Sequence, residues 1–391
     1  MNLTELDRAR DVALDVSGWG RRFVFYQPRN FAFWGYLALV GIGVLTFFST
    51  LAREYNAYGE AVGLAVTSFA IYAALFWWFT DRIDHYAKLP HKLMVVAFLW
   101  GGFAATGAMA ANANDALLAL YGKNFGQVWA LNWGAGLAAP FTEEFAKGAG
   151  LLLLIALAQR HIRTAFDGFI LGAFIGLGFQ ILEDISYAMT SAGTQFGANQ
   201  IGASVGTIVL RMLTGVAAHI LYSAIFCAGL VYLVGRAGEP RKIIRGLVLI
   251  IIPMLLHGTW DSVATIAGQN ALLLIGLLLG TITVALIIVA RVYKLTVARE
   301  RDFVHAVMAP EQARDVITPI ELEAMAGNRK ARKTYRKAGR NRHERRRARY
   351  ILNAAYSLAD ELAAARGADT DRVRFARSEV ARIRAGVPSP W

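Results

Sequence analysis

The chain has 391 residues, of which 56% are hydrophobic, and its mean hydropathy is +0.40. This composition argues against an ordinary soluble protein and favours a polytopic membrane domain with a soluble tail. The net charge is +13, and a single cysteine, Cys227, excludes a disulfide framework.

The N-terminal segment, residues 1–30, carries charges before any apolar run begins. These charges are Glu5, Asp7, Arg8, Arg10, Asp11 and Asp15. A cleavable signal peptide has instead a short basic start followed by an apolar centre. We therefore expect the first hydrophobic run to act as a signal anchor.

Runs of about 20 mostly uncharged residues then recur, the length that crosses a hydrocarbon core roughly 30 Å thick. We predict an all-α bundle of about eight transmembrane helices within residues 31–290. Pro140 is expected to begin the fourth span, because proline suits the first position of a helix. Residues 127–139 would then lie at the outer interface or re-enter the membrane. The predicted spans are 31–50, 61–80, 93–112, 140–158, 167–187, 207–235, 246–267 and 271–290.

Lysines and arginines are distributed unevenly between the loops. With a cytoplasmic N-terminus, 14 basic residues before the tail lie inside, whereas the outer loops hold only Arg53 and Lys123. Positive residues favour the cytoplasmic side of a membrane. Both termini are therefore predicted to be cytoplasmic, in a multi-pass protein.

The C-terminal tail, residues 291–391, has a different composition. It contains 23 lysines and arginines against 12 acidic residues, and 12 of the basic residues fall within Arg329–Arg349. A basic, helical segment on the cytoplasmic face suits anionic lipid headgroups. RNA offers the same phosphate chemistry, but a nucleic acid partner is not expected.

Nine ionisable residues fall within the predicted spans away from their ends. Such charges are costly in hydrocarbon and usually face the interior of a bundle. They could form only structural ion pairs, such as Glu144 with Lys147. The predicted topology, however, brings them from four helices to the outer half of the bilayer, which favours one water-accessible pocket. The nine are Glu143, Glu144, Lys147, Glu183, Asp184, Arg211, His219, His257 and Asp261.

Helical spacing places some of these residues on shared faces. His257 and Asp261 are four residues apart, so Asp261 can orient or charge the imidazole. Arg211 and His219 recur at four-residue steps through Gly215. Glu143 and Glu144 point about 100° apart, so only one of them is expected to face the centre.

Two glutamates and two histidines in a secluded pocket suit hydrolysis. A buried carboxylate can take a proton from water, and histidines can hold that water or stabilise an oxyanion. Zinc is an open alternative, with His219, His257 and Glu183 as candidate ligands. The sequence has no HExxH or GxSxG motif, and Ser223 is interpreted as a helix hydroxyl.

Four short motifs in this order resemble the PrsW-type intramembrane proteases, which are related to the type II CAAX prenyl endopeptidases. EEFAK at residues 143–147 matches EExxK, and FQILE at 179–183 matches FxxxE. HGTWD at 257–261 matches HxxxD, and His219 supplies the intervening histidine. The resemblance covers about residues 30–290, and the basic tail lies outside it.

The resemblance implies peptide-bond hydrolysis in a bacterial plasma membrane, near its extracytoplasmic side. It implies a membrane-anchored substrate, such as a single-span anti-sigma factor. Glu143 or Glu144 would activate water, and Lys147 and Arg211 would support the charges. The catalytic site would be completed by Glu183, His219, His257 and Asp261.

Two other functions remain open at this point. A proton-coupled transporter would need a polar path to both faces, but the cytoplasmic halves of the motif helices are nearly uncharged. A non-catalytic scaffold would use the same polar cluster to hold partner helices.

Overall fold

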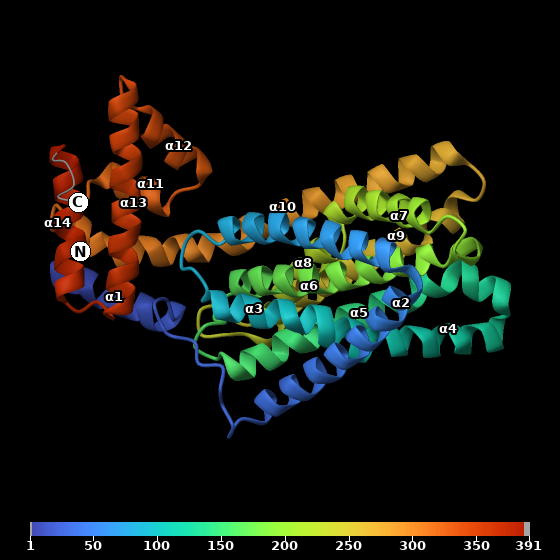
Figure 1. Cartoon of the computed structure of the whole chain (residues 1–391). Coiled ribbons are helices and arrows are strands. Elements are labelled where there is room, and N and C mark those ends of the chain that lie inside the picture. Colours follow the sequence, from blue (N-terminus) through green and yellow to red (C-terminus); the bar gives the residue numbers. More distant parts are fainter. Residues whose placement is uncertain (1, 387–391) are drawn as a thin grey trace. The chain divides into compact units, whose positions relative to one another are not determined.

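The computed structural model describes residues 2–386, which are helical almost throughout and contain no β-strand within that range (Figure 1). The chain divides into two compact units. The membrane unit comprises Phe23–Ile83 and Pro90–Leu295, and the basic unit comprises Met1–Arg22, Asp84–Leu89 and Thr296–Trp391. Most of the expected N-terminal segment therefore groups with the tail rather than standing alone.

The protein is a multi-pass membrane protein, and the predicted all-α membrane bundle is confirmed. Six helical stretches among the described residues are long and apolar enough to cross a membrane. They are α2 (Phe31–Ile83), α3 with η1 and α4 (His91–Phe125), α6 (Ala165–Ala192), α7 with α8 (Gln200–Val234), α9 (Ile243–Ala267) and α10 (Ala271–Ala313). The α10 helix exposes Leu272, Ile275, Leu279 and Ile287, as expected for a surface that faces lipid.

Seven of the eight predicted spans coincide with continuous helix to within one residue, 207–235 is interrupted, and several expected loops are helical. Residues 51–60 continue α2, which is interrupted only by the non-helical backbone of Tyr58. The stretch from 113 to 139 is helical too, apart from Gly126 between α4 (Ala111–Phe125) and α5 (Gln127–Leu157). The count of eight remains a prediction, because α2 holds two of the predicted spans in one helix and α5 is not among the six stretches.

The expectation that Pro140 begins a helix is wrong. Pro140 lies inside α5, which runs unbroken from Gln127 to Leu157. Proline cannot donate to the carbonyl four residues earlier, that of Gly136. At this point α9 comes so close that a Cβ on Gly258 would lie 2.7 Å from the Gly136 oxygen. Membrane helices tolerate an internal proline where a neighbouring helix packs against the freed backbone.

The predicted span 207–235 is broken immediately before His219. Helix α7 (Gln200–Thr214) is followed by the short 3₁₀ turn η3 (Gly215–Ala217) and by Ala218, whose backbone is not helical. The amide of Gln180 donates to the Gly215 carbonyl (3.0 Å), which satisfies this part of the break. Arg211 and His219 therefore do not share one helix face, and His219 is instead the first residue of α8 (His219–Val234).

The central element of the membrane unit is α6, which packs against α2, α3, α5, α7 and α8 (Figure 1). Thr164 and Asp167 form a capping box at its start. Small residues let α8 approach closely: a Cβ on Gly172 or Gly176 would lie 2.3 Å from the carbonyl oxygens of Ser223 and His219, respectively. This packing fixes the start of α8, and with it His219.

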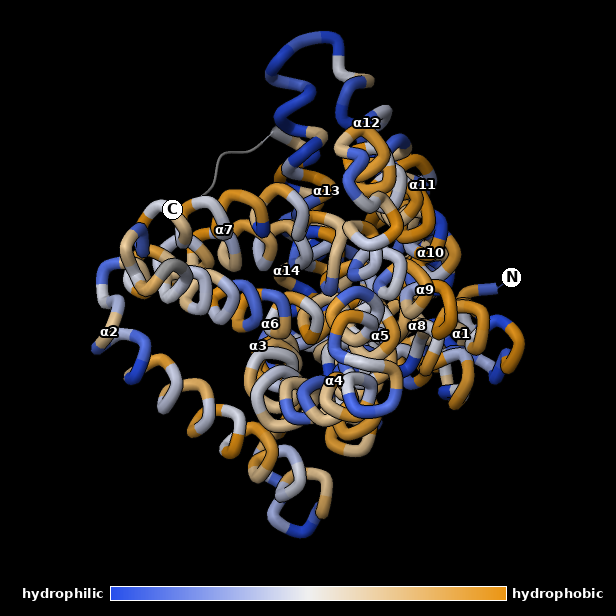
Figure 2. Tube along the Cα trace, turned by 90° about the vertical axis from the view of Figure 1, so that its right-hand side faces the viewer, coloured by the Kyte–Doolittle hydropathy of each residue, from blue (hydrophilic) through white to orange (hydrophobic). Residues whose placement is uncertain are grey.

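The remaining elements of the membrane unit are α3 (His91–Leu99), the π-helix η1 (Trp100–Ala110) and the 3₁₀ turn η2 (Thr194–Gly197). The basic unit contains α1 (Leu3–Ser17), the end of α10, α11 (Pro319–Ala326), α12 (Arg329–Lys337), α13 (Arg342–Ala364) and α14 (Asp371–Ala385). In Figure 2, α12 and the first turns of α13 are hydrophilic, in agreement with the basic run at 329–349.

Candidate active site

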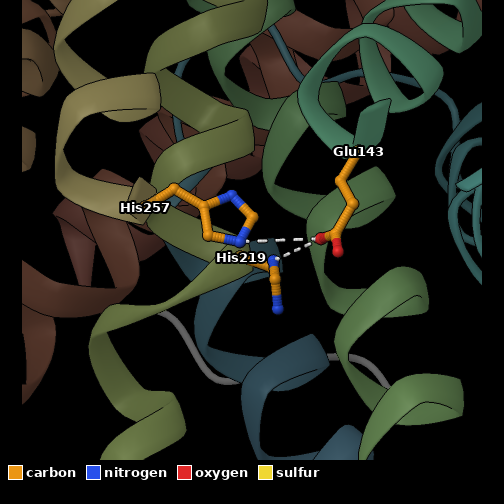
Figure 3. Close-up of side chains that lie close together, drawn as sticks. All are labelled: Glu143, His219 and His257. Atoms are coloured by element: carbon orange, nitrogen blue, oxygen red, sulfur yellow. Dashed lines mark ion pairs between the residues drawn. The ribbon is translucent and has the colours of Figure 1, made fainter. Parts of the chain in front are cut away.

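Glu143, His219 and His257 face one another inside the membrane unit (Figure 3). Glu143 lies midway along α5, His219 begins α8, and His257 lies in α9. The Glu143 Oε2 atom is 3.7 Å from His219 Nδ1 and 3.6 Å from His257 Nε2. All three side chains are buried, so this is a small polar centre within an apolar bundle.

The outer nitrogen of each histidine lies against a second carboxylate. His219 Nε2 is 2.9 Å from Glu183 Oε2, and His257 Nδ1 is 3.2 Å from Glu144 Oε1. A carboxylate only accepts hydrogen bonds, so these outer nitrogens carry the hydrogens. In neutral imidazoles, the lone pairs of the inner nitrogens are then directed at Glu143.

Lys147 is fully buried behind these residues. Its Nζ donates to Glu144 Oε1 (2.7 Å) and contacts His219 Nδ1 (3.0 Å), and Glu143 Oε2 lies 3.6 Å away. The ammonium also lies 4.1 Å from the centre of the Phe179 ring. Lys147 therefore compensates the charge of Glu144 in particular, and the two form a buried pair.

Arg211 anchors the other side of the centre. Its guanidinium donates to both Glu183 and Asp184 and stacks on the ring of Tyr187 at 4.5 Å. Glu183 is thus held between an arginine and a histidine. This geometry fixes the imidazole of His219 in one tautomer and one orientation.

A cavity of about 280 Å³ opens beside Glu143, His219 and His257. Glu183, Arg211 and Asp261 also line it, whereas Glu144, Lys147 and Ser223 do not. Asp261 Oδ2 lies 3.5 Å from His257 Nε2, as the four-residue spacing predicts. Of the two adjacent glutamates, Glu143 therefore faces the cavity, and Glu144 supports His257 from behind.

The eight residues predicted for the site form one connected network of contacts in the structure. Two further polar residues take part that the sequence did not assign to the site. Asn114 in α4 donates from Nδ2 to Glu143 Oε1 (3.1 Å) and accepts a hydrogen bond from Thr142. Both could have been noticed, since Asn114 falls in a polar run, NAND, and Thr142 adjoins the two glutamates.

The inner face of this centre fits a metal ion. Tetrahedral zinc with ligands at about 2.0–2.1 Å places its ligand atoms about 3.4 Å apart, close to the 3.6 and 3.7 Å found here. Glu143 Oε2 is buried without a hydrogen-bond partner within residues 2–386. Carboxylates on the outer nitrogens are also typical of metal-binding histidines. Glu143 replaces Glu183 in this candidate set, and Lys147 competes for His219 Nδ1.

A centre of this composition, inside a helical membrane bundle, is typical of a membrane-embedded hydrolase. Residues 89–291, more than half of the chain, match the family described as PrsW family intramembrane metalloprotease. The chain belongs to this family, which confirms the resemblance drawn from the four motifs. No solved structure matches the chain.

Three curated relatives are similar to parts of the chain, and each is named protease PrsW. The Bacillus subtilis protein is 29% identical over 130 residues, covering 33% of this chain and 53% of its own length. The Halalkalibacterium halodurans protein is 27% identical over 235 residues, which cover 59% of this chain and 82% of its own length. The Clostridioides difficile protein is 24% identical over 141 residues, which cover 36% of this chain and 55% of its own length. The chain thus spans about half the length of two of these relatives.

Proposed function

We propose that this protein hydrolyses peptide bonds of membrane-anchored proteins at the cavity beside Glu143. The observation that carries the proposal is the Oε2 of Glu143, which has no hydrogen-bond partner within residues 2–386 and lies at the cavity between two carboxylate-oriented histidines. Such a carboxylate can take a proton from water while the water oxygen attacks the peptide carbonyl. The proton then passes to the leaving amine, so that water is added across the broken bond.

The other residues act on this step from fixed positions. His219 and His257 line the cavity and are close enough to Glu143 to stabilise an oxyanion near it. Glu183 and Glu144 orient the two imidazoles, and Lys147 compensates Glu144. We assign the reaction to residues 31–290.

A zinc ion is the metal we propose for this centre, with Glu143, His219 and His257 as its ligands. It would supply Lewis-acid activation of water or of the peptide carbonyl. Two observations favour it: the family is described as a metalloprotease family, and two imidazole lone pairs and a carboxylate oxygen converge here. The contact of Lys147 with one of these histidines competes with a metal ion and favours the metal-free reaction. An experiment therefore has to decide between the metal-dependent and the metal-free reaction.

The test uses the purified full chain, reconstituted in lipid with a panel of single-span peptides that vary beside the membrane. We expect new peptide ends by mass spectrometry, lost at least about 100-fold in Glu143→Gln. Glu144→Gln should retain more activity, because Glu144 does not line the cavity. Unchanged cleavage by Glu143→Gln would refute the site. The absence of cleavage by the wild type would leave a scaffold or a transporter, and the latter predicts ion flux lost in Glu183→Ala.

Metal dependence is tested on the same samples. One zinc per chain, with activity lost to a chelator and restored by zinc, would support the metal centre. Full activity in metal-free protein would instead assign the reaction to Glu143 alone. Metal content should also fall in His257→Ala, which gives a readout that does not depend on cleavage.

The substrate we propose is a single-span protein, such as a membrane-anchored anti-sigma factor, cut near the extracytoplasmic side. The support is the uneven distribution of basic residues, which directs the cavity end of the bundle outward. Because Cys227 is the only cysteine and is buried, single-cysteine variants can test this topology. Asn124→Cys and Thr194→Cys should react with an impermeant reagent added outside, and Arg160→Cys should not. The reverse pattern would invert the topology.

We also propose that the basic run at 329–349 binds anionic lipid headgroups. Glu344 is its only acidic residue, and its carboxylate accepts a hydrogen bond from the backbone amide of Arg340 beside the N-cap Asn341 of α13. Arg329, Lys330 and Lys333 are exposed or half-buried, with no ion-pair partner among residues 2–386. In nanodiscs containing anionic lipid, hydrogen exchange of α12 should slow at low salt but not at high salt. Equal exchange in neutral and anionic nanodiscs would refute this, and protection only by added RNA would reassign the surface.

A further inference from the structure

The mouth of the catalytic cavity is unevenly charged. Four carboxylates line the cavity: Asp115 from α4, Glu143, Glu183 and Asp261. Arg211 is the one lysine or arginine among the lining residues that the structure describes, and it is committed to Glu183 and Asp184. Glu143 lies 3.6 Å from Lys147, whose Nζ is closer to Glu144 at 2.7 Å, and Asp115 and Asp261 have no lysine or arginine partner within residues 2–386.

Asp115 is the most exposed of these four carboxylates. It is exposed, it is the residue after Asn114, and it makes no ion pair within residues 2–386. The side chain of Asp261 is 22% exposed, and its charged neighbour is His257. These two carboxylates therefore remain available to a ligand even when the inner centre is fully used.

A second observation points to a ligand with positive charge. Glu143 is 4% exposed, lines the same cavity and has no hydrogen-bond partner for Oε2 within the described range. An excess of carboxylates over cations in the lining of a cavity with low-dielectric walls focuses a negative potential there. Trp260 also lines the cavity and offers an aromatic ring beside Asp261.

We propose that the site selects peptide segments with a lysine or arginine beside the scissile bond, and that Asp115 determines this preference. The basic side chain would lie toward Asp115 and Asp261, while the peptide bond lies at Glu143. This proposal rests on the proposed function, because it assigns a substrate class to the same cavity. A complementary charge pair chiefly adds specificity and guides encounter, which is the effect expected here.

The test compares single-span peptides that differ only in one juxtamembrane residue, which is Lys, Gln or Glu. Wild-type protein should cleave the Lys peptide with a kcat/KM about tenfold above that of the Glu peptide. Asp115→Asn should reduce this ratio, Asp115→Glu should retain it, and Asp115→Lys should reverse it. Glu60→Gln, an exposed acid outside the cavity lining, is the matched control and should leave the ratio unchanged.

A binding measurement separates this proposal from the proposed function. The same three peptides are titrated against Glu143→Gln, with and without Asp115→Asn, and their affinities are compared. A Lys preference that Asp115→Asn removes supports the proposal, even if the wild type cleaves no peptide and the proposed function fails. Equal affinities for the three peptides, or a Lys preference that persists in Asp115→Lys, would overturn it.

Discussion

The membrane unit and the basic unit both bury carboxylates, but they satisfy them differently. In the basic unit, Glu311 is fully buried, and each of its oxygens accepts a hydrogen bond from Arg377, at 2.7 and 2.8 Å. In the membrane unit, one oxygen of Glu143 has no hydrogen-bond partner within residues 2–386 and faces a cavity. A buried charge whose hydrogen bonds are all made helps to rigidify a fold. A buried oxygen without a hydrogen-bond partner needs an explanation, and for Glu143 we propose that the explanation is its role in catalysis.

The surroundings of the two carboxylates differ in the same way. Arg314 and Arg10 lie 3.7 and 3.9 Å from Glu311, so its negative charge meets an excess of positive charge. Around Glu143 the other acids outnumber the two cations, Lys147 and Arg211. The basic unit therefore uses its charges to join α1, α10 and α14, and the membrane unit uses them to orient two histidines.

The largest effect on stability should come from breaking the buried pair of Glu311 and Arg377. Glu311→Ala leaves Arg377 without its buried partner and should destabilise the basic unit by about 3–5 kcal/mol. Hydrogen exchange of α1 and α14 should accelerate, while metal content and cleavage by the membrane unit stay unchanged. Glu379→Ala, which removes a partly exposed pair with Arg382, is the control and should have little effect. Equal exchange in the two variants would refute the structural role of Glu311.

The next effect concerns an orienting carboxylate of the membrane unit. Glu183→Gln keeps the size of the side chain but weakens its hold on His219 Nε2. We expect cleavage or metal affinity to fall about 10–100-fold, as for other partners of metal-binding histidines. The unfolding temperature should change little, since Arg211 keeps its bond to Asp184. A loss of folding without a change in the activity of the folded fraction would make Glu183 structural instead.

The fold class could be predicted, and so could the polar residues that the structure brings together, because charges are rare in apolar runs. Each one inside a predicted span stands out, and a shared depth follows from counting basic residues in the loops. The choice between Glu143 and Glu144 could not be made, because it depends on the rotation of α5. That rotation is set by packing against α9 at Gly136 and Gly258, which no local pattern encodes.

Two other features lay beyond the sequence for different reasons. The polar run containing Asn114 and Asp115 lowers the local hydropathy, so the helix α4 was assigned to a loop and its two site residues were missed. The break before His219 depends on a hydrogen bond from Gln180, 35 residues away from Gly215. Tertiary contacts of this kind override the helical period on which span prediction rests.

A third prediction tests whether packing, rather than charge, positions the site. Gly172→Ala would place a Cβ 2.3 Å from the Ser223 carbonyl oxygen and force α8 away from α6. Overpacking of this kind costs about 1–3 kcal/mol and should shift His219. Thermal unfolding in detergent and cleavage should both decline. Gly276→Ala is the matched control, since no atom lies within 4 Å of its added Cβ; equal stability of the two variants would contradict this packing role.

The smallest expected effect is a dependence of stability on pH in the basic unit. His85 of the basic unit packs between Tyr86 and Tyr356, with ring centres at 5.7 and 4.8 Å. Burial, together with the nearby charges of Arg332, Lys88 and Arg336, lowers the pKa of His85 from 6.5 to about 4. Above pH 6.5 the histidine is neutral whether this region is folded or open.

Below that value the open form takes up a proton more readily than the folded form, so stability falls between pH 6.5 and about 4. We expect hydrogen exchange of residues 84–89, corrected for intrinsic rates, to accelerate by up to about 20-fold between pH 7 and 5. His85→Phe keeps the ring packing and should remove this dependence, whereas His343→Phe, at an exposed position, should not. The same acceleration in His85→Phe would assign the pH sensitivity to a group other than His85.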